Sequence, residues 1–290
     1  MKHFLVLVII ISCCIQGNAQ IKSKKFSSAL QEVIAKKSDK ETIDVLLSVK
    51  DLSQIHRKEK IQILNEYAPS QTALVRLKIA DLNELVNSDE IVFADTYRKP
   101  VEELTTGALE ISLNKISFSH NQFPFITGDS IFASIKEQRF DTNDIDIKGR
   151  YFNSNVAAPS LASHASIMTT MLAGGANTSP FAKGAAWGSY VTSSDFASLL
   201  PDADSVYQKY KITIQNHSYG TGIENYYGAD AAAFDLSTKN NPSLLHVFSA
   251  GNSGTLTSTS GPYTGVQGFA NITGSFKMAK NIITVGATDS

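Results

Sequence analysis

Residues 211–254 begin with KITIQNHSYG (211–220) and end with LLHVFSAGNSG (244–254), and the run ADAAAFDLS (229–237) lies between them. Each flanking segment opens with a short apolar run, which predicts strands over 211–215 and 245–249. The alanine-rich run between them predicts a helix. A strand, a helix and a second strand in this order predict a βαβ unit whose two strands are parallel.

The same alternation continues outward from this unit. Short apolar runs predict further strands over 131–135, 190–193 and 282–285, and helical patterns cover 165–172 and 203–210. Strands that alternate with helices bury both faces of a parallel sheet. The predicted fold class is therefore α/β, with a mostly parallel sheet that carries helices on both faces.

The N-terminal third follows a different pattern. We predict strands over 43–49, 73–79 and 90–97, and helices over 57–67 and 80–87. Five elements within about sixty residues indicate a small α+β sandwich over residues 40–100. The following stretch PVEELTTG (100–107) is predicted to be an exposed linker that proteases can reach.

The first residues are typical of an export signal. Lys2 and His3 precede the apolar run 4–11, and small residues follow up to Ala19. We predict a signal peptide that is cleaved after Ala19, with a retained membrane anchor or a lipoprotein signal as alternatives. Both cysteines lie inside this segment, so the mature chain has no disulfide and no thiolate nucleophile.

The charge balance excludes several kinds of partner. The chain has 26 Lys and Arg against 27 Asp and Glu, which gives a formal net charge of −1. A chain without a basic excess is not expected to bind nucleic acid, and one without an acidic excess carries no solvating tail. No zinc motif, phosphate loop or dinucleotide fingerprint occurs in the sequence.

Polar residues follow several of the predicted strands. Glu137 comes after the strand near Ile131, the run 218–220 follows the strand near Lys211, and Asn252 follows the strand near Leu245. Ligands of open α/β sheets bind at the carboxyl ends of the strands. We therefore expect these residues, together with His164 at the start of a helix, to gather at one edge of the sheet.

Five motifs, in this order along the chain, resemble those of the subtilisin-like serine peptidases. They are SHAS (163–166) with its apolar helix and AGG (173–175), GAAW (184–187), SYG (218–220), FSAGNSG (248–254) and TVGATD (284–289). The resemblance covers about residues 126–290.

The resemblance implies a role for each motif. His164 would be the general base, and Asn252 would donate a hydrogen bond to the oxyanion of the tetrahedral intermediate. Ser218, Tyr219 and Gly220 would pair through their backbone with an extended polypeptide substrate. It also implies that the N-terminal α+β domain is a propeptide, which would act as an intramolecular partner of the peptidase domain.

The acid of the catalytic triad has two candidates. The family carries an aspartate at the end of the first core strand, and aligning DTNDIDIKGR (141–150) with the following loop puts Glu137 at that position. A glutamate is one methylene longer but can still accept the imidazole Nδ1–H. Asp141, several residues past the strand, is the alternative.

The nucleophile is not found in the sequence. The family places its Gly-Thr-Ser motif after the strand that 282–285 matches, whereas the TGS at 273–275 precedes that strand. We therefore expect the sequence to be a fragment that is inactive alone. The alternative function is a non-catalytic peptide-binding module, and the absence of a G-x-S-x-G elbow disfavours an unrelated α/β hydrolase.

These expectations divide the chain into three parts. They are a signal peptide over 1–19, a propeptide-like α+β domain with its linker over 20–105, and a partial subtilisin-like peptidase domain over 106–290. The expected location is secreted, periplasmic or at the cell surface, with no nucleic-acid partner and no membrane contact after signal cleavage. No cofactor is predicted, since Asp144 and Asp146 offer oxygens to a structural calcium but also fit a solvated acidic loop.

Overall fold

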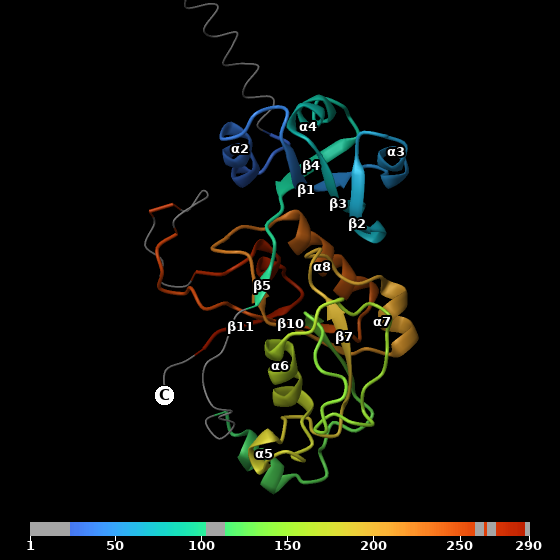
Figure 1. Ribbon diagram of the computed structural model, residues 1–290, viewed down its shortest axis with the longest axis vertical. Helices are drawn as coiled ribbons and strands as arrows, with labels where there is room; N and C mark the ends of the chain where they lie inside the picture. The colour runs from blue at the N-terminus through green and yellow to red at the C-terminus, as the bar shows by residue number, and fades with distance from the viewer. Residues whose placement is uncertain (1–23, 103–113, 259–263, 266–270, 288–290) are drawn as a thin grey trace, which may run out of the picture. The chain divides into compact units, whose positions relative to one another are not determined.

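The computed structural model describes residues 24–102, 114–258, 264–265 and 271–287 (Figure 1). The predicted signal peptide lies outside these residues. The chain divides into two compact units, one comprising residues 1–98 and 259–265 and the other residues 99–258 and 266–290. Among the described residues, the helices are too short and too polar for any of them to cross a bilayer.

The first unit is a four-stranded antiparallel sheet with helices. After α2 (Ser28–Ala35), the elements run β1 (Thr42–Val49), α3 (Leu52–His56), β2 (Gln62–Tyr67), β3 (Thr72–Lys78), α4 (Ile79–Leu85) and β4 (Ile91–Thr96). The strand order is β2-β3-β1-β4. Val45, Val75 and Leu82 belong to its buried apolar core. The order β-α-β-β-α-β is that of a split βαβ fold.

The predicted helix over 57–67 is wrong, because residues 62–67 form strand β2. This strand pairs with β3, and the register shifts between Ile63 and Asn65. The irregularity leaves Leu64 exposed while Ile61 and Ile63 pack against the core. The extra residue breaks the two-residue alternation of a strand, so the apolar positions fall at helix-like spacing.

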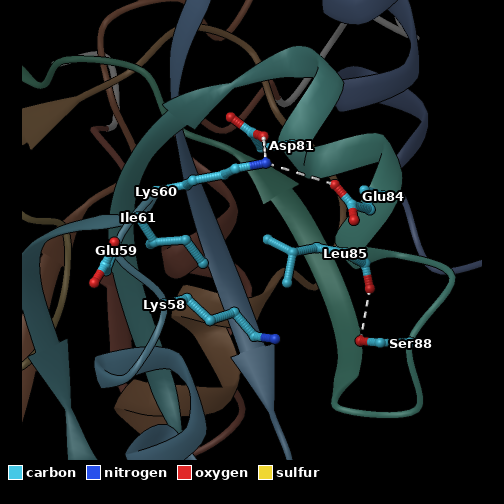
Figure 2. Close-up of a pocket in the computed structure, with 8 residues that line it drawn as sticks. All are labelled: Lys58, Glu59, Lys60, Ile61, Asp81, Glu84, Leu85 and Ser88. Atoms are coloured by element: carbon cyan, nitrogen blue, oxygen red, sulfur yellow. Dashed lines mark hydrogen bonds and ion pairs between the residues drawn. The ribbon is translucent and has the colours of Figure 1, made fainter.

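A shallow pocket of the first unit lies beside α4 (Figure 2). Ile61 and Leu85 line it, and the ammonium of Lys60 lies 3.1 Å from a carboxylate oxygen of Asp81 and 3.9 Å from one of Glu84. Lys60 is largely exposed, and ion pairs of exposed side chains contribute little to the stability of a fold, because water screens them. This pocket contains none of the predicted site residues.

The second unit contains a parallel five-stranded sheet of order β11-β10-β8-β6-β7. Its strands are β6 (Phe132–Glu137), β7 (Tyr190–Asp195), β8 (Ile214–His217), β10 (Leu245–Ser249) and β11 (Ile283–Val285). The helices are α5 (Ile116–Gln122), α6 (Ser163–Ala173), α7 (Asp204–Tyr210) and α8 (Ala229–Asn240), with short 3-10 turns at Pro180–Ala182 and Ser275–Met278, and the first unit has one such turn at Ala68–Ser70. The predicted α/β fold class is confirmed.

Strand β6 shows why helices are needed on both faces of this sheet. Ile135 packs with Ala165 of α6. Its neighbour Ser134 points to the opposite face, where its hydroxyl accepts a hydrogen bond from Gln215, which in turn accepts one from Tyr207 of α7. Each face of the strand is therefore buried under a different helix.

A buried ion pair anchors the end of β6. The Nζ of Lys136 lies 2.6 Å from Oδ1 of Asp202, and both side chains are buried. Ser194 and Gln215 donate further hydrogen bonds to the same carboxylate. Because successive residues of a strand point to opposite faces, holding Lys136 on the α7 side directs Glu137 to the α6 side.

The segment that was predicted to be an exposed linker contains a paired strand. Val101 and Glu102 form β5, which is antiparallel to β9 (Tyr219–Gly220), with Val101 opposite Gly220 and Glu102 opposite Tyr219. Residues 103–107 of the predicted linker lie outside the described residues. Backbone pairing with a distant strand explains the difference, since the local sequence carries no signal of it.

Candidate active site

Three neighbouring strands bring the predicted site residues to one edge of the sheet. Glu137 is the last residue of β6, Ser218 follows β8 directly, and Asn252 lies three residues beyond the end of β10. These strands are adjacent and parallel, so their carboxyl ends lie at the same edge. This is the edge at which open α/β sheets bind ligands.

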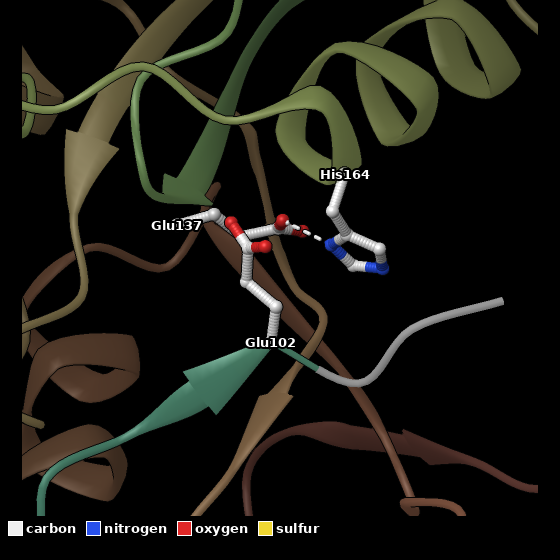
Figure 3. A group of neighbouring side chains, drawn as sticks. All are labelled: Glu102, Glu137 and His164. Atoms are coloured by element: carbon white, nitrogen blue, oxygen red, sulfur yellow. Dashed lines mark hydrogen bonds and ion pairs between the residues drawn. The ribbon is translucent and has the colours of Figure 1, made fainter.

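His164 and Glu137 form a buried hydrogen bond. The Nδ1 atom of His164 lies 2.7 Å from Oε2 of Glu137, and the two side chains are 2% and 0% exposed. His164 is the second residue of α6, and Figure 3 shows its imidazole facing the carboxylate at the end of β6. A carboxylate at this distance holds the proton on Nδ1, so that Nε2 is the basic nitrogen.

Asp141, the alternative acid, takes part in different contacts. Its carboxylate accepts a hydrogen bond from the backbone N–H of Asn143, and its own N–H donates to the hydroxyl of Ser166. These bonds close the loop that follows β6. Of the two candidate acids, it is Glu137 that the fold brings to His164.

Burial raises the pKa of Glu137, because removing a carboxylate from water disfavours its charged form. The hydrogen bond and the positive charge of His164 act in the opposite direction, and the hydroxyl of Ser218 lowers the pKa slightly. The carboxylate of Glu102 raises the pKa of Glu137 further, since two like charges disfavour each other. The site therefore holds a carboxylate whose charge depends on its imidazole partner.

The three residues predicted to bind substrate occupy strand β9 and the position before it. Tyr219 and Gly220 pair with β5 of the same chain. The side chain of Tyr219 is fully buried against Phe248 and Phe276, so its backbone, and not its ring, is available for pairing at this edge. Ser218 accepts a hydrogen bond from the side-chain amide of Asn216.

Asn252 lies on an exposed turn after β10. The preceding residue, Gly251, has a φ of 101°, which a side chain would disfavour. The backbone of Ala250 fixes the base of the turn, since its N–H donates to Val285 and its carbonyl accepts from Thr273. The turn thus presents Asn252 from a rigid strand end.

Ser275, in the TGS sequence that was rejected as the nucleophile motif, is engaged elsewhere. It is buried, and its hydroxyl donates a 2.6 Å hydrogen bond to Asp230 of α8. This hydrogen bond fastens the loop that carries Ser275 to helix α8.

A chain of buried hydrogen bonds links the end of β8 and strand β9 to β10 and α8. The imidazole of His217 contacts the hydroxyl of Tyr219 at 3.1 Å and Nδ1 of His246 at 3.0 Å, and Nε2 of His246 contacts the hydroxyl of Ser237 at 3.2 Å. Burial lowers the pKa of His217 well below its usual value and that of His246 to about 3. Both imidazoles are therefore neutral in the folded protein.

This pair predicts an acid-sensitive fold. Because the folded pKa of His246 is about 3 and the unfolded value is about 6.5, the unfolded chain binds protons first as the pH falls. The free energy of unfolding should drop by about 1.4 kcal/mol per pH unit for each imidazole below about pH 6.5. Urea titrations at several pH values, followed by the fluorescence of Trp187, measure this slope.

The control for this prediction is His246→Gln, which removes one of the two titrating groups. Its unfolding free energy should depend less steeply on pH than that of the unsubstituted chain. Equal slopes in the two proteins would contradict the assignment.

The residues suggested for calcium take part in hydrogen bonds within the protein. The buried carboxylate of Asp146 accepts hydrogen bonds from the backbone N–H groups of Asn177 and Thr178 and from the hydroxyl of Thr178, while the guanidinium of Arg150 donates to the carbonyl of Asp146. Asp144 accepts from the N–H of Asp146. Calcium takes six to eight oxygen ligands, and the structural calcium suggested for these two aspartates stays a prediction.

Sequence reasoning missed Glu102. Its carboxylate, the carboxylate of Glu137 and the imidazole of His164 form one cluster (Figure 3). One carboxylate oxygen of each glutamate and one ring nitrogen of the histidine all lie within 4.8 Å of one another. Only the pairing of β5 with β9 brings Glu102 to this edge, and no local pattern could have revealed it.

A parallel sheet of this order, with a histidine at the start of a helix bonded to a carboxylate at a strand end, defines the subtilisin-like class of serine peptidase folds. Residues 77–290 match the subtilase family. The chain therefore belongs to the subtilase family.

Solved structures show the same fold. The epidermin leader peptide processing serine protease (EpiP) of Staphylococcus aureus aligns with a TM-score of 0.63 and 14% identity, over 86% of this chain and 70% of its own. Fervidolysin of Fervidobacterium pennivorans, described as a keratinolytic enzyme related to subtilisin, aligns with a TM-score of 0.51 and 16% identity, over 74% of this chain and 40% of its own. No curated protein matched the chain.

Proposed function

We propose that this protein is the precursor of a secreted serine endopeptidase that hydrolyses peptide bonds in extended polypeptides. The observation that carries the proposal is the 2.7 Å hydrogen bond between His164 and Glu137 at the carboxyl edge of the sheet. A buried carboxylate that orients an imidazole beside a peptide-pairing strand is the arrangement that acyl transfer by a serine requires. Residues 1–19 would be the signal peptide, 20–105 the propeptide and 106–290 part of the peptidase domain.

The proposed reaction has two halves. A serine hydroxyl attacks the carbonyl carbon of the scissile bond while Nε2 of His164 takes its proton, and the side-chain amide of Asn252 donates a hydrogen bond to the oxyanion. The C–N bond then breaks, and His164 gives its proton to the leaving amine. Water hydrolyses the acyl-serine ester by the same route. In the family this serine follows the strand that corresponds to β11, so activity is to be measured on a form of the chain that extends to include it.

The backbone of β9 supports the choice of substrate. In this protein it already pairs with an extended segment, β5, in antiparallel register. A polypeptide substrate would form hydrogen bonds with the same backbone groups, and such bonds do not depend on the side chains of the substrate. The occupation of β9 by residues that precede the peptidase domain also supports the proposal that the N-terminal region acts as a propeptide.

A serine-directed organophosphonate tests the proposal. The extended chain should hydrolyse an unstructured polypeptide such as casein, and the phosphonate should label it once per molecule and abolish the hydrolysis. Peptide binding without hydrolysis or labelling would identify the protein as a binding module on the same fold.

Substitution of Asn252 should separate transition-state stabilisation from substrate binding. In Asn252→Ala, kcat should fall by about 100- to 1,000-fold with little change in KM, because the lost hydrogen bond forms only with the oxyanion. Steady-state kinetics on a peptide substrate provide the measurement. Asn155→Ala, on the surface of the same unit, is the matched control and should leave kcat unchanged.

A further inference from the structure

Three side chains from three elements meet at the edge of the sheet. Glu102 comes from β5, Glu137 from the end of β6 and His164 from the start of α6, and one potential ligand atom from each lies within 4.8 Å of the other two. Figure 3 shows both carboxylates on the side of the imidazole that carries Nδ1. Only the first of these residues lies outside the proposed catalytic pair.

The charges of this cluster do not balance. Two carboxylates face one imidazole, and even a protonated imidazole neutralises only one of them. Lys136, which precedes Glu137 in the chain, points to the other face of the sheet and pairs with Asp202. A buried carboxylate needs a positive partner, because the desolvation of an unpaired charge is strongly unfavourable.

Two oxygens of the cluster also lack hydrogen bonds. Glu137 is fully buried, and its Oε1 has no partner that satisfies hydrogen-bond distance and angle, although the hydroxyl of Ser218 is close enough to influence its pKa. Oε1 of Glu102 is likewise buried without a partner. Fully buried carboxylate oxygens that lack donors are rare in folded proteins, and these two point into the same cluster.

We propose that Glu102, Glu137 and His164 bind a divalent transition-metal ion, for which Zn²⁺ is the probe. Two carboxylate oxygens and one imidazole nitrogen form a ligand set that zinc accepts, with its fourth position open to water. Zinc bonds of about 2.0–2.2 Å place neighbouring ligand atoms roughly 3.3 Å apart, which side-chain rotations reach from the observed spacing. The ion would take the place of the proton shared by His164 and Glu137.

The ligand set discriminates between metals. Calcium and magnesium prefer oxygen ligands, whereas an imidazole nitrogen suits zinc, cobalt or nickel. The pairing of β5 with β9 holds Glu102 next to the other two ligands in advance. Binding should therefore need only small movements and should tie β5 to the sheet.

Isothermal titration calorimetry on the 290-residue chain tests this site. ZnCl₂ should bind with one tight site per chain, and Co²⁺ should give visible absorption bands from the bound ion. Glu102→Gln preserves the shape of the side chain but not its charge. Loss of a group that only contacts a metal ligand lowers metal affinity by roughly 10- to 100-fold, and the loss of affinity for Zn²⁺ in Glu102→Gln should be larger than that. Ca²⁺ and Mg²⁺ should not compete with Zn²⁺ for the site.

Matched variants keep this test decisive. His56 and Glu66 form an exposed pair at 2.8 Å in the first unit, which is a second place where zinc could bind. His56→Gln should leave the tight site unchanged, whereas His164→Asn should remove it. Tight binding that survives Glu102→Gln or His164→Asn in a folded protein, or no binding at all, would overturn the proposal. The readout is metal binding without catalysis, so its outcome does not depend on the proposed function.

Discussion

In an extended, active form of the chain, replacing His164 with alanine is expected to lower kcat for peptide hydrolysis by roughly a millionfold, the loss that follows removal of the corresponding base in subtilisin itself. His164 is the one imidazole bonded to a carboxylate at the strand edge of the described sheet. In the proposed mechanism, His164 removes the proton from the attacking serine and returns one to the leaving amine. Pre-steady-state kinetics should show the loss in the acylation step, with KM nearly unchanged.

The matched control for this variant is His120→Gln. His120 lies on α5 of the same unit, is half-buried and has its Nε2 3.1 Å from the backbone oxygen of Ala185. It should retain full activity. Undiminished hydrolysis by His164→Ala would remove the basis of the proposed mechanism.

Glu137→Gln is expected to lower kcat by about 10,000-fold while the protein remains folded. An amide can donate to Nδ1, which favours the imidazole tautomer that carries its proton on Nε2 and cannot act as a base. It also removes the negative charge that stabilises the imidazolium in the transition state. The variant should bind peptides as before, so the measurement is kcat at saturating substrate.

Two comparisons sharpen this prediction. Glu137→Asp keeps the carboxylate on a side chain that is one methylene shorter. Its activity should therefore lie between that of the unsubstituted protein and that of Glu137→Gln. Asp141→Asn should be fully active, because the carboxylate of Asp141 bonds to the loop backbone. A severe loss in Asp141→Asn, with activity preserved in Glu137→Gln, would reassign the acid.

The peptidase fold could be predicted because its strands are short apolar runs separated by helical stretches, and each element is encoded locally. The predicted strand near Ile131 and helix near Ala165 correspond to β6 and α6, within a few residues at each end. The strand over 62–67 could not be predicted, because the register shift after Ile63 gives it a misleading spacing of apolar residues. The local sequence does not predict the ends of a strand when pairing with another strand decides where they fall.

The candidate site was predictable to the same extent. Glu137 and Asn252 were expected at the sheet edge because each follows a recognisable strand, and the fold places them there. Glu102 was not expected, because its position depends on a pairing between segments far apart in the chain. Similarly, the sequence does not predict that Lys136 is buried, because its partner Asp202 lies in a loop far along the chain from β6.

The pairing of β5 with β9 also affects any peptide added from solution. Because β5 belongs to the same chain as β9, its pairing is intramolecular, and it competes with a free peptide at an effective concentration that the linkage sets. A free peptide of equal intrinsic affinity would have to reach a similar concentration to displace it. Measured affinities of this chain for peptides should therefore understate the intrinsic affinity of the strand, and severing the chain between the two strands should increase them without altering a single contact.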